Sequence, residues 1–170
     1  MVIHKKEQKV IIYDTCGLII TYWRTGSFYL PKPLYNEGIH VVTAGVIDEL
    51  SNLNSGNGSV KISTYPLLNK IYSAWACGEL TIDDKSKIDQ KLKDRLPQIL
   101  RNNSPKKNQR VGVGEESIIA SLTKRFKKNE VIIVTQDSDV ANLLEGLNLT
   151  ERVKTINPEI RINSRNTNKT

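Results

Sequence analysis

The chain has 170 residues, a length that fits one domain with a hydrophobic core of its own. Hydrophobic residues make up 38% and charged residues 25% of it, and no apolar run approaches the roughly 18 residues that a membrane span needs, which excludes an integral membrane protein. The net charge of +7 and the pI near 9.4 favour a polyanionic partner, because lysine and arginine gain affinity for phosphates by releasing counterions.

The cysteines and the two ends of the chain indicate which kind of protein this is and where it is located. Cys16 and Cys77 form no CxxC or Cys/His ligand pattern, so neither a disulfide framework nor a zinc site is predicted, and a reducing, cytoplasmic location fits. Asp14 interrupts the first apolar run and no small-residue cleavage site follows, so no secretory signal is expected. We expect a basic N-terminal extension (1–9), one globular domain (10–156) and a polar, flexible C-terminal tail (157–170).

The first half of the chain alternates apolar β-branched runs with amphipathic segments. VIIYD (10–14) predicts a buried strand that ends in Asp14, and TCGLIITYWR after it predicts a helix. IHVVT (39–43) predicts a second strand, and Thr43 is expected to cap the helix AGVIDELSNL. The polar segment 51–59 is expected to form a loop.

The second half continues the alternation of helical and strand patterns. A helix is predicted from Pro66 to Gly78, and VIIVT (131–135) is the clearest strand of this half, followed by a helical pattern in DVANLLEGL. The remaining expectations are a strand over 79–83, an amphipathic helix over 83–100, a basic loop over 101–114, a helix over 114–129 and a last strand over 152–156.

Strands that alternate with helices predict the fold class. Such a pattern favours parallel pairing through right-handed crossovers, and therefore an α/β fold: a three-layer α/β/α sandwich with a mainly parallel central sheet and Rossmann-like topology. In such sheets the site lies beyond the carboxyl ends of the strands, near the point where the strand order reverses.

Carboxylates from separate segments are predicted to meet at that edge of the sheet. They are Asp14, Glu49, the pair Glu115 and Glu116, and the pair Asp137 and Asp139. Carboxylates about 4 to 6 Å apart repel by on the order of 1 to 4 kcal/mol per pair, so the cluster requires a cation. Oxygen ligands suit Mg²⁺ or Mn²⁺, and a metal so held would activate water against a phosphodiester. Hydrolysis of a nucleic-acid backbone therefore joins the acidic cluster to the basic remainder of the chain.

Each of these acids also has a structural explanation when it is taken singly. Asp14 is able to cap the next helix, and Glu49 to face solvent on an amphipathic helix. Glu115 and Glu116 complement a helix dipole, and the acids at 137 and 139 fit an Asx-type turn. The functional interpretation is favoured because all of these explanations would otherwise have to hold together at one edge of the sheet.

Four segments, in this order, resemble the PIN-domain nucleases, a family that includes toxin-like ribonucleases. They are VIIYDTCGLI, VIDEL, VGVGEESIIA and VIIVTQDSDV, and the resemblance covers residues 10 to 145. It implies a PIN-like fold and a metal-dependent endoribonuclease acting on RNA. It also implies a possible antitoxin partner and homodimer, although the chain is longer than the usual toxin around residues 54–110, which leaves an RNA-processing nuclease open.

The resemblance also implies roles for individual residues. Asp14, Glu115 and Asp137 match the metal-centred acids, and Glu49 matches a further ligand or water-orienting group. The hydroxyls of Thr15 and Thr135 are expected to support this cluster. Glu116 competes with Glu115 for its position in the cluster, and Asp139 is expected to supplement Asp137 or to cap the next helix. The alternative is a non-catalytic PIN-like module that binds RNA or protein.

Overall fold

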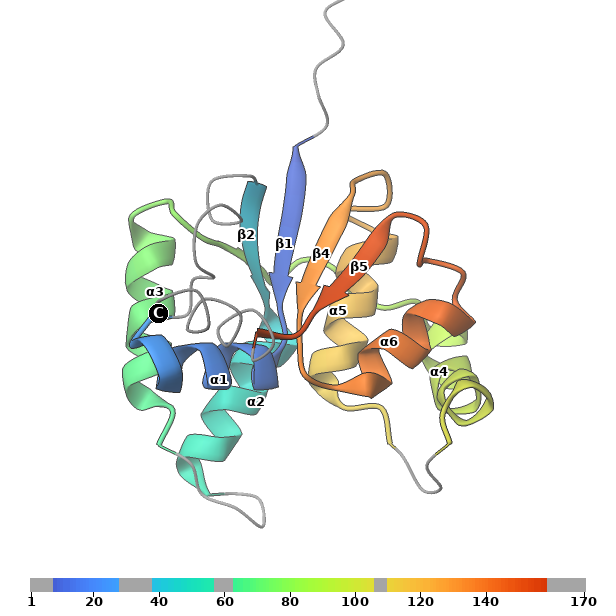
Figure 1. Ribbon diagram of the computed structural model, residues 1–170, viewed down its shortest axis with the longest axis horizontal. Helices are drawn as coiled ribbons and strands as arrows, with labels where there is room; N and C mark the ends of the chain where they lie inside the picture. Colours follow the sequence, from blue (N-terminus) through green and yellow to red (C-terminus); the bar gives the residue numbers. More distant parts are fainter. Residues whose placement is uncertain (1–7, 28–37, 57–62, 106–109, 159–170) are drawn as a thin grey trace, which may run out of the picture.

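Five strands form one parallel sheet at the centre of the protein (Figure 1). The computed structural model describes residues 8–27, 38–56, 63–105 and 110–158, so most of the predicted N-terminal extension and C-terminal tail lie outside the described residues. The strands are β1 (Lys9–Tyr13), β2 (Gly38–Thr43), β3 (Thr81–Asp83), β4 (Val131–Val134) and β5 (Val153–Ile156). The described helices are α1 (Thr15–Thr25), α2 (Ala44–Ser55), α3 (Tyr65–Ala76), α4 (Gln90–Asn103), α5 (Val113–Thr123) and α6 (Ser138–Gly146).

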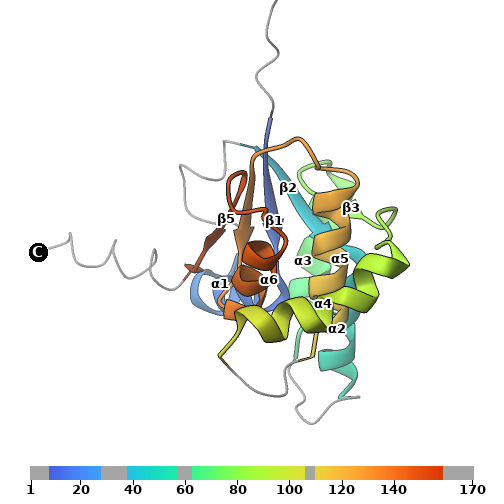
Figure 2. The ribbon, with the colours of Figure 1, turned by 90° about the vertical axis from the view of Figure 1, so that its right-hand side faces the viewer.

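The predicted fold class is confirmed. All pairings in the sheet are parallel, and α1 and α5 lie on opposite sides of the strands, so the sheet is the middle layer of an α/β/α sandwich (Figure 2). The strand order is β3-β2-β1-β4-β5. The chain moves outward from β1 through β2 to β3 and then crosses back to β4, so the order reverses between β1 and β4. Polar groups at the carboxyl ends of these two strands therefore flank the expected ligand position.

The two central strands are buried on both faces, which explains their continuous apolar sequences. The side chains of β1 from Val10 to Tyr13 are fully buried, and those of β4 are at most 9% exposed. Tyr13 brings a hydroxyl into this core and satisfies it with a 2.7 Å hydrogen bond to His40 Nδ1 on β2. His40 is itself buried, so the two polar side chains satisfy each other inside the core.

The predicted loop over 51–59 is wrong in its first part. Helix α2 continues through Ser55 and ends at Gly56, which has a left-handed φ of 71°. Glycine adopts this conformation without the steric cost of a Cβ, so it sets the end of the helix more strongly than the polar composition before it.

Helix α4 is displaced towards the C-terminus relative to the prediction of 83–100. It begins at Gln90 because the Asp89 side chain caps it by accepting a hydrogen bond from a backbone N–H of the first turn. It runs on to Asn103, so the loop predicted over 101–114 is shorter than expected.

Helix α5 is shorter than the predicted 114–129. It starts at Val113 and ends at Thr123, after which the chain turns so that Phe126 is buried. The Phe126 N–H donates a 2.9 Å hydrogen bond to the Ser121 carbonyl, which closes this turn. Burial of the Phe126 ring therefore ends the helix at Thr123, and the basic residues that follow lie outside it.

No helix in the described part of the chain combines the length and the apolarity that a membrane crossing requires.

Glycine at position 17 allows α1 to start directly against the end of β4. A Cβ at this position would overlap the backbone carbonyl of Val134, which cannot move away without disturbing the sheet. Alanine ordinarily stabilises a helix by roughly 0.5 to 1 kcal/mol relative to glycine, so Gly17→Ala tests the contact by the sign of its effect.

We expect Gly17→Ala to lower the free energy of unfolding by about 1 to 3 kcal/mol in urea titrations, because a well-packed contact is overfilled. The control is Asn52→Ala at an exposed position of α2, which we expect to be neutral or stabilising. A Gly17→Ala protein as stable as the wild type would contradict the close packing of α1 on β4.

Candidate functional site

Asp14 lies at the carboxyl edge of the sheet, between β1 and α1. Its side chain is 4% exposed. Oδ1 accepts a 2.8 Å hydrogen bond from the Thr15 N–H, and Oδ2 accepts one of 2.7 Å from the Thr135 hydroxyl. Asp14 therefore caps α1, as the structural explanation predicts, and also faces the end of β4.

Thr135 connects Asp14 to Asp137. The Asp137 N–H donates a 2.9 Å hydrogen bond to Thr135 Oγ1, the same atom that donates to Asp14. Asp137 is half-buried and caps α6 by accepting a 2.8 Å hydrogen bond from the Asp139 N–H. The residues after β1 and β4 thus meet at one shared hydroxyl, Asp14 through its carboxylate and Asp137 through its backbone N–H. Asp139 lies in the first turn of α6.

Glu49 reaches the same edge from α2. Its Oε2 accepts a 2.5 Å hydrogen bond from the Thr15 hydroxyl, and its Oε1 accepts one of 2.8 Å from the Gly114 N–H in the first turn of α5. The alternative that Glu49 faces solvent is wrong. Glu49 instead joins the start of α1 to the start of α5, since the N-cap residue of α5, Gly112, has no side chain to satisfy that turn.

Glycines in the VGVGEE segment make room for these carboxylates. A Cβ on Gly114 would lie 2.6 Å from Glu49 Oε2, and one on Gly112 would lie 2.5 Å from Glu115 Oε2. A Cβ on Gly45 of α2 would overlap the Val113 carbonyl, so α2 and α5 approach closely only because this position is also glycine. The glycine spacing therefore positions the acids as well as the backbone.

Glu115 is the acid with the most unusual environment. Its Oε2 is buried without a hydrogen-bond partner, the one side-chain nitrogen or oxygen in the described residues in this state. Burial raises the pKa of Glu115 to about 7, and repulsion from Glu49 and Asp14 adds to this shift while backbone amides of Glu115 and Gly112 oppose it. The carboxylates of Asp14 before α1, Glu49 on α2 and Glu115 on α5 therefore lie close enough to repel one another.

Glu116 points to a different neighbour. It forms a 2.9 Å ion pair with Lys93 of α4. Two consecutive acids in the first turn of α5 thus separate, one towards the sheet edge and one towards a surface helix, and both still complement the dipole of α5.

Cys16 is part of the site, although the sequence analysis considered it only as a disulfide or zinc residue. Its Sγ lies 3.2 Å from Asp14 Oδ2 and 3.3 Å from Thr135 Oγ1, and accepts a 3.2 Å hydrogen bond from the Gln136 N–H. Burial, with the charge of Asp14, raises the pKa of Cys16 to about 11, so the thiol stays protonated and donates to the carboxylate. Its position two residues after the strand-end acid was the available signal.

The oxygens of Asp14 and Glu49 are directed at protein donors. Hydroxyl, thiol and amide groups occupy them, and within the described residues no group of three or more His, Cys, Asp or Glu side chains is arranged to hold a metal ion. The chemistry of the donor set nevertheless fits a hard divalent cation. The carboxylates offer oxygen ligands, the Cys16 thiol beside them stays protonated, and the buried Glu115 oxygen lacks a partner.

Comparison of the chain with protein-family models, with curated proteins and with solved structures gives no match.

Glu115 gives this site a measurable pH dependence when divalent ions are absent. In the folded protein the pKa of Glu115, about 7, lies above the ordinary value of 4.5 that the unfolded chain has. Above pH 7 the buried charge therefore destabilises the fold, and between pH 7 and 4.5 the folded state takes up a proton before the unfolded state does and recovers stability. We expect Glu115→Gln to be more stable than the wild type by roughly 1 to 3 kcal/mol at about pH 8, measured by urea unfolding with a chelator present. Its amide also offers donors to the neighbouring carboxylates.

The control for this measurement is Glu116→Gln on the same helical turn. It removes a partly exposed ion pair, and we expect the free energy of unfolding to change by no more than about 0.5 kcal/mol. A Glu115→Gln protein that is less stable than the wild type at about pH 8 would show that the Glu115 charge does not destabilise the fold.

Proposed function

We propose that this chain is a metal-dependent endoribonuclease that hydrolyses RNA phosphodiester bonds with Mg²⁺ or Mn²⁺ held by Asp14, Glu115 and Asp137, with Glu49 beside them. One observation carries the proposal: a buried, unpartnered Glu115 oxygen lies in the field of two further carboxylates, Glu49 and Asp14. A cation is the ligand that relieves this repulsion.

The residues divide into groups that would hold an ion and groups that orient them. Asp14 and Glu115 would contribute oxygens, and Asp137 is connected to Asp14 by its backbone N–H, which donates to the Thr135 hydroxyl. Thr15 fixes the rotamer of Glu49 and ties it to the start of α1. A divalent ion bound here supplies positive charge that offsets the charge developing on a phosphodiester during in-line displacement.

RNA is the proposed substrate on two grounds. The acids occur on segments that resemble those of PIN-domain nucleases, in the same order, and the chain carries a net charge of +7, which favours a polyanion. An intracellular role in RNA processing, or as the toxin of a toxin and antitoxin pair that works as a dimer, belongs to the same proposal.

The non-catalytic alternative has one observation in its favour. Hydroxyl, thiol and amide groups already donate hydrogen bonds to Asp14 and Glu49. These acids therefore have partners without a cation, as is expected of acids with a purely structural role in a binding module. Cleavage and metal binding separate the two proposals, because a binding module takes up RNA and does not cut it.

We expect purified protein to cleave single-stranded RNA with Mn²⁺ or Mg²⁺, and a chelator to abolish the reaction. Asp14→Asn and Glu115→Gln should each lower the rate roughly 100-fold or more, because each removes a charge that holds the ion. Glu116→Gln is the matched control and should cut like the wild type, since Glu116 pairs with Lys93. Equal cleavage by all four proteins would assign the activity to a contaminant.

Ion binding should also be detectable without any substrate. An ion that binds only the folded protein stabilises it by about 2.7 kcal/mol when its concentration is roughly 100 times its dissociation constant. We expect Mn²⁺ to raise the unfolding midpoint of the wild type and of Glu116→Gln, and to have little effect on Asp14→Asn. A midpoint that does not respond to Mn²⁺ in the wild type would refute the proposed metal site.

A further inference from the structure

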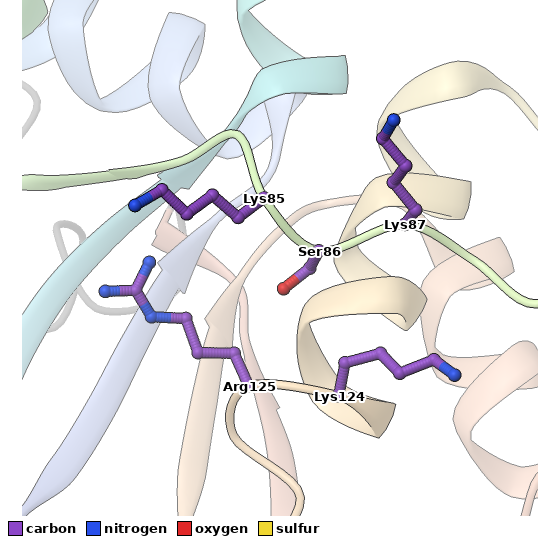
Figure 3. Close-up of a pocket in the computed structure, with 5 residues that line it drawn as sticks. All are labelled: Lys85, Ser86, Lys87, Lys124 and Arg125. Carbon is purple, nitrogen blue, oxygen red and sulfur yellow. The ribbon is translucent and has the colours of Figure 1, made fainter.

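A basic pocket lies apart from the acidic cluster, between the loop after β3 and the end of α5 (Figure 3). Its volume is about 560 Å³. The residues that line it, here called the basic pocket, are Lys85, Ser86, Lys87, Lys124 and Arg125. The four cationic residues are exposed, so their charges are available to a ligand from solvent.

Asp83 holds the two segments of the pocket together. It is the last residue of β3 and is 2% exposed. Its carboxylate accepts hydrogen bonds from the Ser121 hydroxyl of α5 and, at 3.3 Å, from the Ser86 N–H of the loop. Arg125 approaches Oδ1 at 3.4 Å. The loop and the helix end are therefore fixed relative to each other by one buried acid.

The charge of Asp83 is used inside the protein and does not neutralise the pocket. Burial raises the pKa of Asp83, but hydrogen bonds from Ser121 and Ser86 and the charge of Arg125 outweigh this, so the pKa lies below its ordinary value. An ionised Asp83 offsets one cation of the pocket, Arg125, with which it forms an ion pair at 3.4 Å. Three lysines, two from the loop and one from the helix end, remain around the pocket (Figure 3).

The chemistry of these groups selects an anion with several oxygens. Lysine ammonium groups act as point charges for phosphate, and the arginine guanidinium offers planar donors. Among the residues that the structure describes, no large apolar side chain lines the pocket, which favours a charged ligand over an apolar one. A ligand with repeated negative charges would reach cations on both segments at once.

Helix α5 relates this pocket to the acidic cluster. It carries Glu115 in its first turn and ends beside Lys124, and its 11 residues correspond to about 16 Å of length. We propose that the basic pocket binds backbone phosphates of the RNA chain at a distance from the cleavage site, an inference that rests on the proposed function for its choice of polyanion. Phosphate contacts there would fix the register of the RNA without reading its bases.

The test measures RNA binding separately from cleavage. Fluorescence anisotropy with a single-stranded RNA, in chelator so that no cleavage occurs, is compared across salt concentrations. The pocket variant is Lys85→Gln with Lys124→Gln, one change on each segment. The matched control is Lys127→Gln with Lys128→Gln, which removes the same charge from exposed positions next to α5 that do not line the pocket.

We expect the pocket variant to bind RNA roughly tenfold more weakly, and its plot of log affinity against log salt to be shallower by about 1.4, the value for two lost phosphate contacts on a single strand. The control should bind within about twofold of the wild type, because Lys127 and Lys128 do not line the pocket. With metal present, the pocket variant should show a raised KM and an unchanged kcat.

Three results would overturn the inference: equal affinity of the pocket variant and the wild type, an equal loss in the control, or no RNA binding by the wild type. The first would leave an acidic protein partner as the ligand of the pocket. A wild type that binds RNA through the pocket and does not cut it supports the inference while it removes the proposed nuclease activity. A wild type that cleaves RNA, together with a pocket variant that cleaves it with an unchanged KM, supports the proposed nuclease activity and refutes RNA binding by the basic pocket.

Discussion

The hydrogen bond between Thr135 and Asp14 is the contact on which the candidate site depends. Parallel pairing of β1 with β4 brings the ends of two strands that are far apart in the chain to one edge, and this 2.7 Å bond joins them there. The same Thr135 hydroxyl accepts the Asp137 N–H. The Asp14 carboxylate and the Asp137 backbone are thereby both fixed at the edge of the sheet.

The close approach of α2 and α5 adds the remaining carboxylates. Glycines at positions 45, 112 and 114 remove the Cβ atoms that would separate these helices, and Glu49 then bonds to the backbone of α5. Glu115 lies half-buried beside it, and its buried Oε2 atom has no hydrogen-bond partner. Native proteins seldom leave a buried carboxylate oxygen without a partner. A ligand that interacted with this oxygen would offset the unfavourable free energy of burying it.

Helix α5 separates two regions of opposite charge. Its first turn contributes Glu115 to the acidic cluster, and its end contributes Lys124 to the basic pocket that Asp83 organises. An enzyme that cuts a polyanion needs both, because acids that hold a cation repel the substrate until other groups attract it. The geometry of one helix would then set the distance between RNA docking and chemistry.

The sequence by itself determined the parallel α/β fold, because buried strands such as VIIY and VIIV need continuous apolar residues and their alternation with helices leaves few topologies. It also indicated Asp14 and Asp137, since a strand-end position can be read from local pattern. Only the tertiary structure decided that Glu115 joins Glu49 while Glu116 joins Lys93, and that Cys16 touches Asp14. The physical reason is that adjacent residues share a local pattern but point in different directions, so their partners depend on long-range packing. The basic pocket was not predicted for the same reason: its cations come from two segments, each predicted only as part of a helix, that lie side by side only in the folded chain.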